Sequence, residues 1–172
     1  MCYNKIIMQW ELITNIILIT SIITLAVFAL LGLYQWISRK SIKKVDRQLL
    51  WMPVPLILMV ITYLLFQYVF ILSTRPNGSG EPSFPSTHVM VVATIFFIAM
   101  MILPKYVKSK PMRIILDILM IVMISLTSVG RVAADMHWVL DVVGAVVFAF
   151  IFTEIYYLII HRKKKKNAKR IH

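Results

Sequence analysis

Charge, and acidic charge above all, is scarce in this chain of 172 residues. Only 15% of the residues are charged, and seven acidic side chains stand against 19 basic ones. So little charge beside 60% hydrophobic residues excludes a disordered chain. It also argues against an ordinary soluble domain, which is about 45–50% apolar. The single cysteine, Cys2, excludes a disulfide within the chain.

The chain is rich in long apolar runs. Five of them approach the ~20 residues that a helix needs to cross the hydrocarbon core of a bilayer. They are residues 12–37, 49–72, 88–103, 112–129 and 138–160. We therefore predict an all-α integral membrane protein, a bundle of about five transmembrane helices. Residues 1–160 would form a single transmembrane domain and residues 161–172 a basic cytoplasmic tail. The first run is too long for the apolar region of a signal peptide, so we expect it to be retained.

The basic residues are distributed unevenly between the two sides of such a bundle. Sixteen of the 19 lie between the first and second runs, between the third and fourth or at the start of the fourth, or after the fifth. Five spans place these three segments on one side of the membrane, and the positive-inside rule makes that side cytoplasmic. We therefore expect the N-terminus outside, the C-terminus in the cytoplasm and the membrane as partner. No nucleic-acid partner is needed to account for the positive charge.

The first outer connection, residues 73–87, contains Arg75 and several turn-forming residues. At its end, Pro85, Ser86 and Thr87 have the pattern of a helix start with a hydroxyl cap. The free backbone N–H groups and the dipole of a helix start favour an anion. This connection therefore predicts an anion site at the outer membrane face.

The second outer connection runs from Gly130 to His137 and contains Arg131. Gly130 can stop the fourth helix, and His137 would open the fifth. Asp141 would then lie on the same face one turn deeper, where its carboxylate could accept a hydrogen bond from one imidazole nitrogen. The other nitrogen would keep its lone pair, as a nucleophile or a base requires.

The two connections should meet, because the chain crosses the membrane and returns between His88 and His137. Two histidines, two arginines, a helix start and a carboxylate would then share one interface. Arginine binds phosphate through paired, charge-assisted hydrogen bonds. We therefore predict a phosphate site in which an imidazole attacks phosphorus.

These residues resemble the motifs of the type 2 phosphatidic acid phosphatase superfamily. The segment Pro85-Ser86-Thr87-His88 is similar to the family's Pro-Ser-Gly-His motif. The segment from Gly130-Arg131 to Asp141 is similar to its Ser-Arg-x5-His-x3-Asp motif, and Arg75-Pro76 to the end of its Lys-x6-Arg-Pro motif. The resemblance covers about residues 49–160. It implies a membrane lipid phosphatase that uses no metal or other cofactor.

The resemblance also implies a role for each matching residue. His137 would be the nucleophile that forms a phosphohistidine, Asp141 would orient it, and His88 would protonate the leaving group. The phosphate oxygens would be held by Arg75, Ser86, Thr87 and Arg131. The sequence departs from the family at three positions: Tyr68 stands in place of the lysine, Thr87 in place of a glycine and Gly130 in place of a serine.

With its site facing outward, such an enzyme would hydrolyse a lipid phosphate or diphosphate. A diphosphate carrier recycled in envelope synthesis, such as undecaprenyl diphosphate, is the leading substrate, followed by phosphatidic acid or phosphatidylglycerol phosphate. Two alternatives remain open. One is a weak or inactive relative that binds phospholipid, which Tyr68 and Gly130 favour. The other is a metal-dependent membrane enzyme or transporter with the ligands His88, His137, Asp135 and Asp141.

Overall fold

The computed structural model describes the backbone of residues 2–168 and the side chains of residues 5–161. The last residues of the expected basic tail, 169–172, lie outside the described part. Helices account for most of what is described, and the β structure found there is a single isolated bridge between Thr74 and Pro82. The elements in order are α1 (Cys2–Arg39), η1 (Ile42–Lys44), α2 (Arg47–Trp51), α3 (Pro53–Tyr68), α4 (Thr87–Tyr106), α5 (Lys110–Ala133) and α6 (Val139–Ala168).

The prediction of five apolar helices long enough to cross a membrane is confirmed. The short α2 and the following α3 act together as the second span. The five spans are Lys5–Arg39, Arg47–Tyr68, Thr87–Tyr106, Lys110–Ala133 and Val139–His161.

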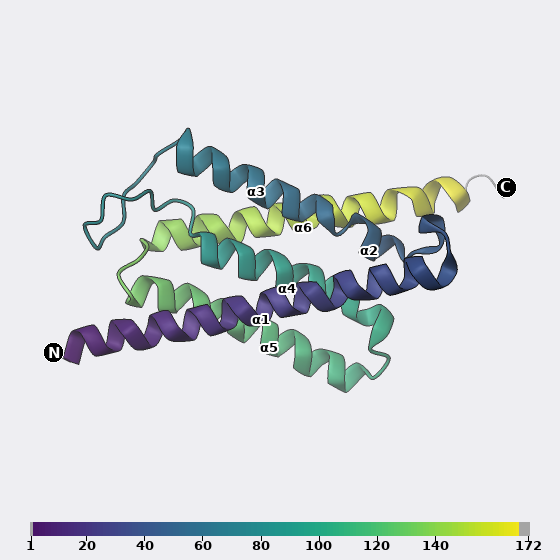
Figure 1. Ribbon diagram of the computed structural model, residues 1–172, viewed down its shortest axis with the longest axis horizontal. Coiled ribbons are helices and arrows are strands. Elements are labelled where there is room, and N and C mark those ends of the chain that lie inside the picture. Colours follow the sequence, from purple (N-terminus) through teal and green to yellow (C-terminus); the bar gives the residue numbers. More distant parts are fainter. Residues whose placement is uncertain (1, 169–172) are drawn as a thin grey trace.

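Helix α4 is the centre of the bundle (Figure 1). It packs against α1, α3, α5 and α6. Its side chains are apolar around most of the helix, as expected for a helix without a solvent or lipid face, and Val92, Phe96 and Ile102 are at most 2% exposed. The surrounding helices each leave an apolar outer face uncovered, with exposed residues such as Ile23 and Ile118. Such outer faces suit contact with lipid.

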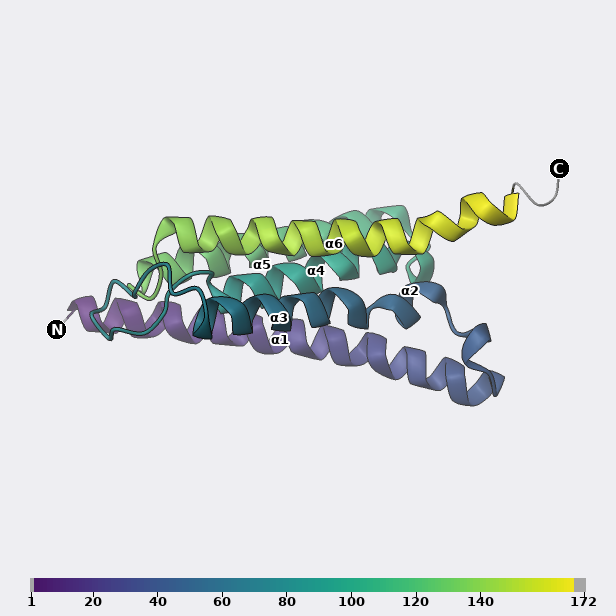
Figure 2. The same ribbon diagram turned by 90° about the horizontal axis from the view of Figure 1, so that it is seen from above.

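The two ends of the bundle carry different connections. The N-terminal end of α1, the α3–α4 connection and the α5–α6 connection lie at one end, and the α1–α2 and α4–α5 connections lie at the other with the C-terminal end of α6 (Figures 1 and 2). This is the grouping expected from five spans. The fold therefore places Arg75 and Arg131 at the end opposite the basic connections. Which end faces the cytoplasm stays a prediction from charge.

The second span ends earlier than the sequence suggested. Helix α3 stops at Tyr68, whereas the apolar run continues to residue 72. The loop that follows is paired with itself, because Arg75 N–H donates to the Glu81 carbonyl at 3.0 Å and Ser83 N–H donates to the Ser73 carbonyl at 2.9 Å. This pairing requires the residues that precede Ser73 to be extended rather than helical. The last apolar residues of the run therefore leave the helix and remain exposed.

The helices that flank the second connection also differ from expectation. Gly130 does not end the fourth span, because α5, which forms that span, continues to Ala133. A glycine within a helix costs only about 1 kcal/mol relative to alanine, so the helix passes through it. His137 lies just before α6, which begins at Val139. Its ring is therefore held by the loop as well as by the helix.

Candidate active site

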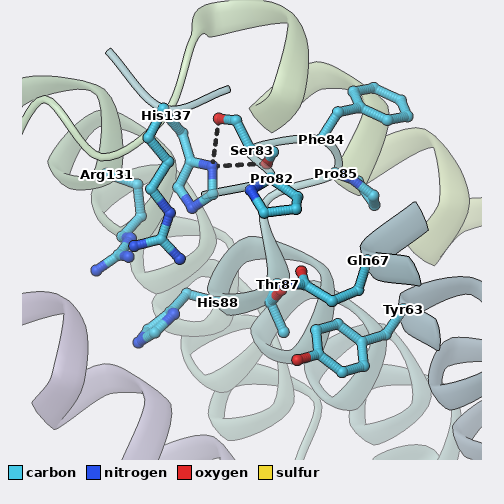
Figure 3. Close-up of a pocket in the computed structure, with 11 residues that line it drawn as sticks. Tyr63, Gln67, Pro82, Ser83, Phe84, Pro85, Thr87, His88, Arg131 and His137 are labelled. Carbon is cyan, nitrogen blue, oxygen red and sulfur yellow. Dashed lines mark hydrogen bonds between the residues drawn. The ribbon is translucent and has the colours of Figure 1, made fainter. Parts of the chain in front are cut away.

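A cavity of about 200 Å³ opens at the end of the bundle that holds both loops. It lies between α3, the loop 69–86, α4, α5 and the α5–α6 connection, and Figure 3 shows its lining side chains. Five of the seven residues that the sequence proposed for the site line it: Arg75, Thr87, His88, Arg131 and His137. The other two, Ser86 and Asp141, are buried. They take part in the hydrogen-bond network around the cavity.

The loop is fixed at the cavity by the ring of Phe84. This ring packs against Phe66 of α3, with 5.1 Å between ring centroids, and against Phe148 of α6 at 6.3 Å. Gly144 of α6 makes the fit possible, because a Cβ atom at this position would collide with the Phe84 ring. The anchored ring holds the neighbouring Ser83 against the first turn of α6.

His137 is held through its Nδ1 atom, which lies 2.9 Å from the Ser83 carbonyl oxygen. A carbonyl only accepts, so Nδ1 carries the proton and donates it. In the neutral ring Nε2 is then without a proton and has its lone pair available. His137 is 4% exposed, and it lies at the cavity wall with Nδ1 bonded to Ser83 (Figure 3).

Asp141 acts on His137 through Ser83. The direct hydrogen bond expected from the sequence is not formed, because Asp141 Oδ2 lies 3.7 Å from His137 Nδ1. The Ser83 hydroxyl donates to Asp141 Oδ2 instead. The same oxygen accepts from the Trp138 backbone N–H at 2.9 Å, and Oδ1 accepts from the Ser73 hydroxyl at 3.2 Å.

Ser83 is therefore a candidate site residue that the sequence reasoning missed. It is 1% exposed and connects the nucleophile candidate His137 to the carboxylate of Asp141. It lies 54 positions before His137, so no local spacing could have pointed to it. The two prolines beside it, Pro82 and Pro85, marked only a turn-rich loop.

Burial and charge keep the His137 imidazole neutral. Burial lowers its pKa to about 4, and the positive charges of Arg131 and Arg75 contribute to the lowering. Asp141 and the Ser83 carbonyl act in the opposite direction on this pKa, but they do not outweigh burial and the two arginines. At neutral pH the ring is therefore uncharged, which is the state a nucleophile needs.

The two arginines give the cavity its positive charge. Arg75 forms an ion pair with Glu81 at 3.0 Å, and Arg131 is 4% exposed. The buried Nε atoms of both arginines have no hydrogen-bond partner among the described residues. An unpartnered buried guanidinium N–H is costly, and a phosphate oxygen is the type of acceptor that would satisfy it.

The start of α4 lies beside the arginines. Ser86 is the N-cap residue of α4, but its side chain does not form the expected capping bond. Its hydroxyl is buried and has no partner in the described part of the chain, and its backbone N–H donates to the Asp141 carbonyl at 3.1 Å. Thr87 opens the helix and lines the cavity. The backbone N–H groups of the first turn of α4 have no acceptor within the helix.

Tyr68, which stands at the position of the family's lysine, does not take part in the cavity. Its side chain is 72% exposed. The residue before it, Gln67, lines the cavity together with Tyr63 of the same helix (Figure 3). This wall therefore offers neutral hydrogen-bonding groups where the family has a cation.

The alternative ligand set for a metal is not assembled. Within the described residues, no group of three or more histidine, cysteine, aspartate or glutamate side chains lies together. His88 is instead bonded to an amide, with its Nε2 atom 3.1 Å from Asn15 Oδ1 of α1.

Comparisons with known proteins bear on the family and the fold of the chain. The sequence model of the PAP2 superfamily matches residues 68–165, more than half of the chain. Among solved structures, the fold is similar to the crystal structure of a transmembrane PAP2-type phosphatidylglycerolphosphate phosphatase from Bacillus subtilis. The TM-score is 0.66 with 18% sequence identity, over 93% of this chain and 83% of that chain. No curated protein sequence matches the chain.

Proposed function

The chain belongs to the PAP2 superfamily, and from this premise we propose that it is a membrane lipid phosphatase acting through a phosphohistidine. One observation carries the proposal. A buried, neutral histidine, His137, has its Nδ1 proton fixed by Ser83 beside two guanidinium groups with unsatisfied Nε atoms. This arrangement supplies a nucleophile and the charge that a phosphate needs in one cavity of about 200 Å³.

The first step transfers the phosphoryl group to the protein. The lone pair of His137 Nε2 attacks phosphorus, and the bond between phosphorus and the lipid-side oxygen breaks. His88 donates a proton to that oxygen as it leaves. Arg75 and Arg131 hold the other phosphate oxygens and stabilise the charge that they carry in the transition state.

The second step returns the protein to its starting state. Water attacks the phosphorus of the phosphohistidine while His88, now neutral, accepts a proton from that water. The P–N bond breaks, the electron pair returns to Nε2 of His137, and inorganic phosphate is released. Each histidine ends the cycle with the protons it had at the beginning.

The substrate we propose is a lipid diphosphate of the undecaprenyl type, with phosphatidic acid and phosphatidylglycerol phosphate next. The site lies at the end of the bundle opposite the basic connections, and the positive-inside rule supports an outward-facing site. An outward-facing site favours a diphosphate carrier that is recycled in envelope synthesis. The similar fold of a phosphatidylglycerolphosphate phosphatase supports phosphatidylglycerol phosphate as a candidate substrate.

The test is phosphate release by the purified protein in detergent. The substrates are farnesyl diphosphate as a short isoprenyl diphosphate, dioctanoyl phosphatidic acid and dioctanoyl phosphatidylglycerol phosphate, each with and without EDTA. We expect release in the presence of EDTA, and none from the His137→Ala variant. Release that EDTA abolishes would favour the metal-dependent alternative, and no release from any lipid would favour an inactive, lipid-binding relative.

The two histidines can be separated by a paired assay on one monophosphate and one diphosphate. His137→Ala should abolish turnover of both, because no covalent intermediate can form. His88→Ala should impair the monophosphate by ~10²–10⁴-fold, the usual contribution of a general acid. It should impair the diphosphate much less, because a phosphate leaves readily without a proton. Equal loss on both substrates would assign His88 to phosphate binding instead.

A further inference from the structure

His88 is held by a residue from a helix that lies outside the family match. Its Nε2 atom lies 3.1 Å from Oδ1 of Asn15 on α1, whereas the PAP2 match begins at residue 68. An amide oxygen accepts, so Nε2 carries the proton of this hydrogen bond. The bond joins the proposed acid of the site to a residue 73 positions earlier in the chain.

Helix α1 is packed closely enough to keep this contact in place. Gly130 of α5 lies against Thr14 and Trp10, since a Cβ atom at Gly130 would come within 2.6 Å of Thr14 Cγ2 and 3.1 Å of Trp10 Cε3. Thr14 itself is fully buried. One helical turn before Asn15, the carboxylate of Glu11 interacts with the charge of Arg131. Helix α1 therefore contacts the proposed acid through Asn15 and acts on Arg131 through the charge of Glu11.

We propose that Asn15 is a positioning residue of this active site. Its amide oxygen keeps a proton on Nε2 of His88, so that Nδ1 is the nitrogen that gives a proton to the leaving oxygen and later takes one from water. The role rests on the proposed phosphatase function. It parallels the Ser83 carbonyl at His137, because each ring has one nitrogen fixed by an uncharged oxygen and the other left for chemistry.

An uncharged acceptor suits the electrostatic surroundings of His88. The positive charges of Arg131 on α5 and Arg75 on the loop act on the ring, as does His137, and all three residues line the same cavity as His88. From α3, the neutral Tyr63 and Gln67 line the same cavity. A carboxylate in place of Asn15 would favour the imidazolium over the neutral ring. The ring would then give up its proton less readily.

Two substitutions at Asn15 should therefore move the pH–rate profile in opposite directions. Asn15→Asp should shift the basic limb for dioctanoyl phosphatidic acid to higher pH by roughly 1–3 units, the usual effect of an adjacent opposite charge. Asn15→Leu, of similar size, should shift it to lower pH. Asn15→Leu should also reduce the turnover of the monophosphate at least roughly tenfold, which is part of what a general acid contributes. The turnover of farnesyl diphosphate should fall less.

The matched control is Thr20→Val, which removes a hydroxyl from the same helix. The Thr20 hydroxyl donates to the Ile16 carbonyl one turn away, at 2.9 Å, so the parent profile should be retained. If the Asn15 contact merely stabilised α1, both Asn15 variants would lose activity, but the basic limb of their pH–rate profiles would not shift in opposite directions. An active parent whose profile is unchanged in both Asn15 variants would overturn the proposal.

A second readout does not depend on activity. With only four histidines in the chain, ¹⁵N-histidine labelling in detergent can resolve His88, assigned by its loss in His88→Gln. The neutral ring should carry its proton on Nε2 in the parent and lose this preference in Asn15→Leu. If the parent releases no phosphate from any lipid, the phosphatase proposal fails, and the spectrum still tests the contact. A His88 ring that is protonated on Nδ1 in the parent would overturn the role of Asn15.

Discussion

In the proposed site, Glu81 would compete with a phosphate for Arg75. Its carboxylate lies 3.0 Å from the guanidinium, but its own side chain is 59% exposed. Exposed ion pairs contribute about 0–1 kcal/mol, so the substrate displaces this one at little cost.

Glu81→Gln should therefore lower KM roughly two- to fivefold, the factor that corresponds to such a pair. The turnover number and the unfolding temperature should stay near those of the parent, since the Arg75 N–H bond to the Glu81 carbonyl is kept. The measurement is initial-rate kinetics at low and high salt, with the effect larger at low salt. A higher KM would instead mean that Glu81 orients Arg75 for the substrate.

His137 should set the acid limit of the reaction. The neutral ring is the reactive form, and its pKa is lowered from 6.5 to about 4, so the ring stays neutral through the range where an ordinary histidine becomes protonated. For farnesyl diphosphate, kcat/KM reports the ionisations of the free protein, so the acid limb that His137 contributes to the kcat/KM profile should fall near pH 4.

Arg131→Gln provides the control for this assignment. Arg131 lowers the pKa of His137, so its removal should move the acid limb to higher pH, although substrate ionisation is unchanged. If the limb of the parent lies near pH 6.5, the imidazole is not desolvated in the way the structure describes.

At the scale of single elements, the packing of α1 on α5 explains why Gly130 departs from the family's serine. A Cβ atom here would come within 2.6 Å of Thr14, and α1 could not approach the site so closely. Gly130→Ala should destabilise the protein by about 1–3 kcal/mol, as overpacking does. Differential scanning fluorimetry in detergent measures this loss.

Gly32→Ala is the matched control on α1. A Cβ atom there lies 3.6 Å from Leu49 Cβ, an ordinary contact, so the gain in helix propensity should leave stability unchanged or slightly raised. Adding Thr14→Ser, which removes the blocking methyl group, should recover part of the loss in Gly130→Ala. Equal unfolding temperatures for Gly130→Ala and Gly32→Ala would contradict the close approach of α1.

The sequence predicted elements better than it predicted their ends and their contacts. Apolar runs are long and continuous, so five helices could be placed from hydropathy alone. The end of α3 at Tyr68 depends on how the following loop pairs with itself, which no apolar pattern records. Arg75, Arg131 and His137 were found because they stand at span ends. Ser83 and Asn15 were not, because their partners lie far away in the chain, although an amide such as Asn15 within an apolar helix was a signal.

For the whole molecule, the remaining question is which end of the bundle faces outward. Both loops that build the cavity lie at the end where the N-terminus is found (Figure 1). The opposite end carries the α1–α2 and α4–α5 connections, with basic residues such as Arg39, Lys44 and Lys108. Positive charge is retained on the cytoplasmic side during insertion, so the cavity should open outside.

Single cysteines at the two ends test this orientation in intact cells. In a Cys2→Ser background, Ser79→Cys lies in the exposed α3–α4 loop and Ser109→Cys in the exposed α4–α5 connection. A membrane-impermeant thiol reagent should label position 79 and leave position 109 unlabelled until the membrane is permeabilised. Labelling after permeabilisation confirms that both sites are reactive. The reverse pattern would place the cavity in the cytoplasm, and a lipid diphosphate released outside the cell could then no longer be the substrate.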